Sequence, residues 1–107
     1  MGEILNAGML YRGYNTPDPT NSDFTLTGGQ AFTATFDQAC NRLIVVNYSP
    51  YPVNLTLGRP ASSTTYDVVL QPYMGFAGHV NVQSIGLYCA NNAHVAFYTF
   101  REDNTAI

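Results

Sequence analysis

The sequence predicts an all-β fold: an antiparallel β-sandwich or jelly roll of about seven short strands with an extended N-terminal arm. From residue 31 onward the chain is rich in Val, Ile, Thr, Tyr and Phe, and Pro, Gly or Asn interrupts it about every eight to twelve residues. No window of about twelve residues shows the periodicity of a helix. Strands without intervening helices cannot form a parallel sheet, so we expect mainly antiparallel pairing.

The first 30 residues have a different character and predict the arm. Residues 15–23 read NTPDPTNSD, and Pro, Asn, Asp and Ser at this density favour turns over regular structure. Residues 24–27 are a candidate strand before the pair Gly28-Gly29. We therefore expect an extended arm over residues 1–30, a β-sandwich domain over residues 31–100, and a charged C-terminal tail over residues 101–107 that frays.

The first half of the domain predicts three strands. Residues 31–36 (AFTATF) form the first, and Asp37 is expected in the turn that follows. Residues 43–46 (LIVV) are an apolar run too short for a typical helix and suited to a strand covered on both faces. Residues 47–52 (NYSPYP) end this strand, since proline cannot donate to a ladder. Residues 53–57 alternate apolar and polar side chains, which is typical of a half-buried strand.

The second half of the domain repeats the same kind of signal. Turns are expected at residues 58–63, 71–75 and 90–93, where Gly, Pro and Asn gather. The segments between these turns are rich in β-formers, and His79, Asn81 and Gln83 alternate with valines. The predicted strands are residues 66–70, 79–83, 84–89 and 94–100.

Charge is the most informative feature of composition. Residues 41–100 carry three formal charges, Arg42, Arg59 and Asp67, and the chain has no lysine, whereas roughly fifteen charges are expected in a stretch of this length. A free monomer normally uses charge to stay apart from its neighbours, so this body predicts a surface covered by other protein. Four scattered arginines predict no binding of nucleic acid and no polybasic membrane contact.

The residues give no catalytic signature, so we predict no enzyme, no cofactor and no metal site. Cys40 and Cys89 lack the spacing of metal ligands; they are interpreted as two buried thiols, with a disulfide between neighbouring strands as the alternative. A hydrolase would need a cleft that gathers Asp67 with His79 or His94. Exposed tyrosines could instead bind sugars; the candidates are Tyr48, Tyr51, Tyr66, Tyr73 and Tyr88.

Residues 41–100 resemble small virion proteins of tailed bacteriophages. The similarity lies in the run RLIVVNYSPYPVNLTLG (42–58), then YDVVLQP (66–72), VQSIGLY (82–88) and VAFYTF (95–100). In such chains an I-V-V-N-x-S strand and turn precedes an alternating strand, and two late strands close a sandwich. The arm is not covered by this resemblance.

The resemblance implies a capsid decoration protein, or a small head or tail accessory protein, that is synthesised in the host cytoplasm and located in the virion. Its expected partners are the major capsid protein or other virion proteins and copies of itself, with a trimer favoured. We expect the arm to hold a neighbouring subunit through Ile4, Leu5, Met9, Leu10 and Tyr11; equally, the arm could pack on its own domain. The alternative function is a module that binds carbohydrate or a host surface.

Overall fold

The computed structural model describes residues 10–11 and 23–100, and all regular structure within them is β. Its seven strands are β1 (Leu10–Tyr11), β2 (Asp23–Leu26), β3 (Phe32–Asn47), β4 (Val53–Leu57), β5 (Val68–Leu70), β6 (Gly75–Tyr88) and β7 (Ala93–Phe100). All pairings between them are antiparallel except that of β1 with β3. The described residues form no helix that could cross a membrane. The prediction of a sandwich-like, all-β fold of about seven strands is confirmed.

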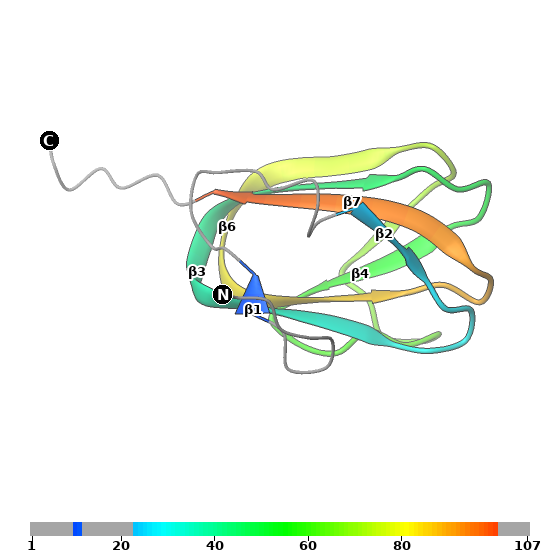
Figure 1. Cartoon of the computed structure of the whole chain (residues 1–107), viewed down its shortest axis with the longest axis horizontal. Coiled ribbons are helices and arrows are strands. Elements are labelled where there is room, and N and C mark those ends of the chain that lie inside the picture. The colour runs from blue at the N-terminus through cyan, green and yellow to red at the C-terminus, as the bar shows by residue number, and fades with distance from the viewer. Residues whose placement is uncertain (1–9, 12–22, 101–107) are drawn as a thin grey trace, which may run out of the picture.

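One bent pair of long strands organises the molecule. Strands β3 and β6 are 16 and 14 residues long and pair with each other along both of their halves. Figure 1 shows both strands curving at one end of the molecule, so that each contributes to two layers. One layer holds β2, β7, the second half of β3 and the first half of β6. The other holds β1, the first half of β3, the second half of β6, β4 and β5.

Irregular pairing produces the bend. Between the pairs Thr35–Ser84 and Cys40–Val82, four residues of β3 lie opposite a single residue of β6. Extra residues of this kind bend a strand and increase its twist without ending the ladder. The turn predicted at Asp37 is therefore wrong, because Asp37 lies inside β3. The two strands predicted at residues 79–83 and 84–89 are likewise one continuous strand, β6.

The core fills the space between the two layers. Strand β4 supplies buried Val53 and Leu55, in the alternation that its sequence predicted. The rings of Phe36, near the bend, and Phe97, on β7, lie 6.3 Å apart at a tilt of 51°, a favourable arrangement for aromatic pairs. The largest fully buried side chains are those of Phe36, Phe97, Leu26, Leu43, Leu55, Leu70, Ile85, Leu87, Val45, Val53, Val95 and Asn47.

The end opposite the bend gathers four connections: residues 27–31, 48–52, 71–74 and 89–92 (Figure 1). Two of them are locked together. The amide of Gly29 donates to the carbonyl of Cys89 at 2.8 Å, and that of Gly28 donates to Oδ1 of Asn92 at 2.8 Å. A Cβ atom on Gly28 would lie 2.8 Å from the carbonyl carbon of Asn91. Only glycine therefore allows the two turns to approach this closely.

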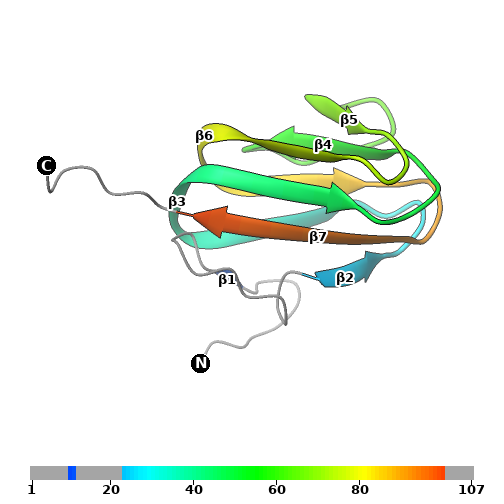
Figure 2. The ribbon, with the colours of Figure 1, turned by 90° about the horizontal axis from the view of Figure 1, so that it is seen from above.

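Two strands lie within the predicted arm. Strand β2, expected at residues 24–27, begins one residue earlier and pairs with β7, as the edge of its layer (Figure 2). Strand β1 pairs in parallel with β3, with Leu10 opposite Thr35. Residues 1–9, 12–22 and 101–107 lie outside the described residues, so the division into arm, domain and tail stays a prediction.

Candidate contact surface

Four large side chains are exposed on two neighbouring loops at the end opposite the bend. Tyr48, Tyr51, Tyr73 and Met74 are 48%, 40%, 65% and 59% exposed. They lie on the connections 48–52 and 71–74, neither of which contains a charged residue. We call these four residues the tyrosine surface.

A buried asparagine holds the two loops together. Asn47 is fully buried at the end of β3. Its Nδ2 donates to the carbonyls of Tyr51 at 2.6 Å, Leu70 at 3.1 Å and Gln71 at 3.2 Å. Its Oδ1 accepts from the amide of Ser49 at 2.9 Å and from the hydroxyl of Ser49 at 2.7 Å. One side chain thus bonds to backbone groups of both loops and ties the loops to each other, while its own buried polar atoms are all satisfied.

Further contacts fix the positions of the tyrosines. The amide of Tyr73 donates to the carbonyl of Ser49 at 3.2 Å. Tyr73 has φ of 61°, in the left-handed region that residues with a side chain rarely adopt. Such a conformation costs of order 1 kcal/mol and persists only where the surroundings impose it. The ring of Tyr48 lies 5.5 Å from that of His94 on β7. The tyrosine surface is therefore carried by a constrained backbone.

The exposed rings of the tyrosine surface are suited to contact with another molecule. Tyrosine offers a large, rigid area of mixed polarity with only two side-chain torsions to immobilise, and it is enriched at binding hot spots. The tyrosine surface contributes no carboxylate, amine or thiol, so it supplies no pair of groups for acid–base or nucleophilic catalysis. Tyr66, also 48% exposed, lies on the separate loop between β4 and β5, and Tyr88 is half-buried.

The acid expected in a hydrolytic cleft has a structural role. One oxygen of Asp67 accepts from the amide of Leu57 at 2.9 Å, and the other from the guanidinium of Arg59 at 2.6 Å. The amide of Leu57 and then Arg59 hold the pKa of the Asp67 carboxyl below its ordinary value of 3.8. Asp67 therefore closes the loop between β4 and β5.

The two histidines lie elsewhere, His79 within β6 and His94 within β7. Among residues 10–11 and 23–100, no group of three His, Cys, Asp or Glu side chains is placed to hold a metal ion.

Both cysteines are buried free thiols, so the disulfide alternative is not the state of this structure. Cys40 lies at the bend of β3, and Cys89 directly follows β6. Burial raises the pKa of the Cys40 thiol from 9.0 to about 11, although hydrogen bonds with backbone groups of Cys40 and Val82 act in the opposite direction. A thiol that keeps its proton in this way is a poor nucleophile.

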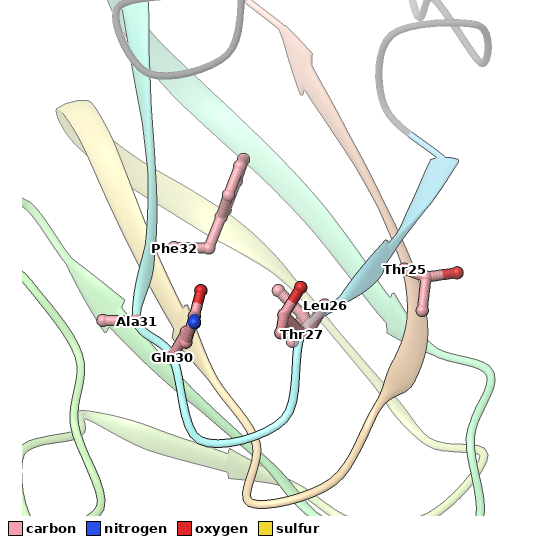
Figure 3. Close-up of a pocket in the computed structure, with 6 residues that line it drawn as sticks. All are labelled: Thr25, Leu26, Thr27, Gln30, Ala31 and Phe32. Carbon is pink, nitrogen blue, oxygen red and sulfur yellow. The ribbon is translucent and has the colours of Figure 1, made fainter.

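A shallow hollow of about 190 Å³ lies at the turn between β2 and β3 (Figure 3). Its lining comes from both sides of that turn, and none of the lining residues is an acid, a base or a thiol. The hollow therefore offers polar hydroxyl and amide groups beside apolar ones, but no side chain that gains or loses a proton near neutral pH. The lining residues are Thr25, Leu26, Thr27, Gln30, Ala31 and Phe32.

The predicted arm anchors are only partly described. Ile4, Leu5 and Met9 lie outside the described residues. Leu10 and Tyr11 form β1, whose backbone pairs with β3 of the same chain. For these two residues, that pairing matches the alternative in which the arm packs on its own domain; their role in holding a neighbouring subunit stays a prediction.

Asn47 and Ser49 were predicted only as parts of the turn at residues 47–52, with no role of their own. A signal was present, since an asparagine directly after a buried apolar strand, followed two residues later by serine, is typical of side-chain-closed turns. What the sequence could not show is that Asn47 also reaches the carbonyls at Leu70 and Gln71, 23 and 24 positions away.

Comparison of the chain with family models, with curated proteins and with solved structures gives no match in any of the three.

Proposed function

We propose that this chain is a structural virion protein that binds the outside of a phage capsid and stabilises it through protein–protein contacts. The observation that carries the contact role is the tyrosine surface: exposed aromatic side chains, held on constrained loops, in a body almost free of charge. The virion part of the proposal comes from the strand pattern of residues 41–100.

The low charge supports this role for an energetic reason. Burying an unpaired charge at an interface costs several kcal/mol, whereas tyrosine rings can be covered at little desolvation cost because the hydroxyl finds a partner. A decoration protein covers several faces at once and gains from such surfaces. The major capsid protein or other virion proteins are the proposed partners, together with copies of the chain itself.

The test is an inventory of purified particles. We expect the chain to co-sediment with the major capsid protein when particles from a culture of the encoding strain are purified through a density gradient and analysed by mass spectrometry. We also expect particles that lack the chain to lose their contents at a lower temperature. Absence of the chain from intact particles would contradict the proposal.

The same exposed rings favour one second candidate, a module that binds carbohydrate or a host surface, including a small tail accessory protein. Aromatic faces stack on sugar rings, and the neighbouring turn 89–92 adds the exposed amide side chains of Asn91 and Asn92. A glycan array probed with the isolated chain separates the two candidates. Saturable binding that depends on Tyr48 and Tyr73 would favour this alternative, whereas association with particles and no glycan binding favours the decoration role.

The arm provides a second proposed contact, through Ile4, Leu5, Met9, Leu10 and Tyr11. Deletion of residues 2–14 tests it, and the deletion also removes β1. We expect weaker association with particles from a variant that remains folded. Unchanged association would show that the arm serves its own domain.

A further inference from the structure

The first half of β6 is the free edge of its layer. The order of strands in that layer is β2, β7, β3, β6, and Figure 2 shows these strands side by side. Strand β4 pairs with β6 only from Ile85 to Tyr88. Within residues 10–11 and 23–100, no strand pairs with the side of β6 that faces away from β3 between Gly75 and His79.

The hydrogen-bonding direction along this edge follows from one contact. The amide of Asn47 donates to the carbonyl of Met74 at 2.9 Å, so Met74 faces β3. Successive residues of a strand direct their backbone groups to alternate sides. Gly75, Ala77 and His79 therefore direct their N–H and C=O groups outward, away from β3, as a template for another strand.

This edge lacks the devices that normally prevent strand addition. Edge strands are commonly protected by charge, by proline or by being very short. Strand β2 has four residues and includes Asp23, and β5 has three residues. The first half of β6, in contrast, contains no charged residue and no proline, and Ala77 and His79 are exposed.

We propose that this edge pairs two copies of the chain, antiparallel and about a two-fold axis that passes beside Ala77. In this register Ala77 faces Ala77 of the partner subunit, and Gly75 faces His79 of the partner subunit. All three outward-directed residues then form facing pairs, each of which exchanges two backbone hydrogen bonds. A continuous sheet runs through both subunits.

The side chains of β6 suit pairing with an identical strand. A two-fold contact places like residues near one another, which is unfavourable for charged strands, and this strand has no formal charge. The same register sets Phe76 opposite Gly78 of the partner subunit, a residue with no side chain to clash with the ring. Within one chain the ring of Phe76 already lies 3.2 Å from where a Cβ atom of Gly78 would be.

The contact is small, about five residues from each subunit, so the isolated dimer is weak. On a shell that holds many copies close together, the high local concentration favours the pairing. Because the contact joins two copies of the chain, it predicts a dimer. This differs from the trimer expected above, which would suit the three-fold sites of a shell. This dimer goes beyond the proposed function and is a property of the isolated chain. A chain that stays monomeric would leave the capsid-binding proposal standing, and absence of the chain from particles would leave the dimer standing.

Substitutions at the two-fold axis test the register. Ala77→Lys and Ala77→Asp each place two like charges opposite each other, and an equimolar mixture of the two variants places Lys opposite Asp. Asn91→Lys adds the same charge on an exposed turn as the matched control. The measurement is sedimentation equilibrium of each protein and of the mixture from roughly 10 µM to 1 mM, the range of weak association. Near-UV circular dichroism confirms that each variant is folded.

We expect a monomer–dimer equilibrium for the wild-type chain and for Asn91→Lys, and dimerisation weakened at least about tenfold in each Ala77 variant alone. The mixture of Ala77 variants should regain dimers. A wild-type chain that stays monomeric at about 1 mM, or Ala77→Lys that dimerises as well as wild type, would overturn the proposal. Loss of dimers in both variants, without recovery in the mixture, would overturn the register in which Ala77 faces Ala77 of the partner subunit.

Discussion

The two ends of the sandwich are held together by different physics. At the bent end, β3 and β6 curve over a core that includes Phe36 and Cys40, both fully buried, and apolar packing fixes the shape. At the other end the chain runs through irregular loops, and hydrogen bonds around buried Asn47 fix them. A nearly uncharged protein can therefore still hold exposed loops in place, if one polar side chain is buried among their carbonyls.

We expect the bent end to be sensitive to loss of side-chain volume, and the loop end to be sensitive to loss of hydrogen-bonding groups. Apolar packing is non-directional and is weakened in proportion to the volume removed. The network of Asn47 is directional, so loss of its amide removes hydrogen bonds from three carbonyls while the volume of the core hardly changes.

The bent end gives the largest expected loss of stability. Phe36→Ala removes a fully buried ring that lies against Phe97, and we expect the free energy of unfolding to fall by about 4 kcal/mol. Urea denaturation measures it. Phe36→Leu, which keeps most of the volume, should lose less than half as much. Equal losses for both variants would mean that the volume of this side chain does not matter at the bend.

The loop end gives the next largest effect. Asn47→Ala removes the donor to three carbonyls and the acceptor for Ser49, and we expect a loss of about 3 kcal/mol in the free energy of unfolding. Asn91→Ala, on an exposed turn, is the control and should change stability by less than about 0.5 kcal/mol. A loss at Asn47 no larger than the loss at Asn91 would mean that the hydrogen bonds of Asn47 do not hold the loop end together.

The bent end should also weaken at high pH. Because the pKa of Cys40 is about 11 in the folded chain and 9.0 ordinarily, the unfolded chain releases this proton first. The contribution of the Cys40 thiol to the free energy of unfolding is therefore fully present below pH 9. It falls by about 2–3 kcal/mol as pH rises toward 11. Urea denaturation between pH 8 and pH 11 measures the slope. In Cys40→Ala this contribution is absent, so a slope as steep as that of the wild type would count against it.

A surface ion pair gives the smallest effect. Asp67→Asn weakens the contacts with Arg59 and the amide of Leu57. Because the pKa of Asp67 is lowered, the native contact contributes stability above about pH 3.8 and loses it as pH falls through the folded value. We expect faster hydrogen exchange at the amide of Leu57 and little change in global stability, since exposed ion pairs contribute little. Unchanged exchange would show that this loop does not depend on Asp67.

The sequence predicted those elements whose signal is local. The alternation of residues 53–57 gave β4 with its observed limits, and NYSPYP gave the loop that follows β3. It did not predict that β3 continues through Asp37, because a bulge depends on the partner strand and not on the residues of the bulged strand alone. The tyrosines were candidates in advance, but their exposure together required the contacts of Asn47 with distant carbonyls. The free edge of β6 follows from strand order, which no local pattern encodes.

Rebinding to particles that lack the chain tests whether the tyrosine surface is where the chain meets its partner. The variant Tyr48→Ser/Tyr51→Ser/Tyr73→Ser removes the rings, and Tyr66→Ser removes an equally exposed ring from a different loop. Binding isotherms from co-sedimentation should show affinity lower by at least about 100-fold for the triple variant, because buried tyrosines are binding hot spots. Tyr66→Ser should bind as the wild type does. Wild-type affinity in a folded triple variant would contradict the claim.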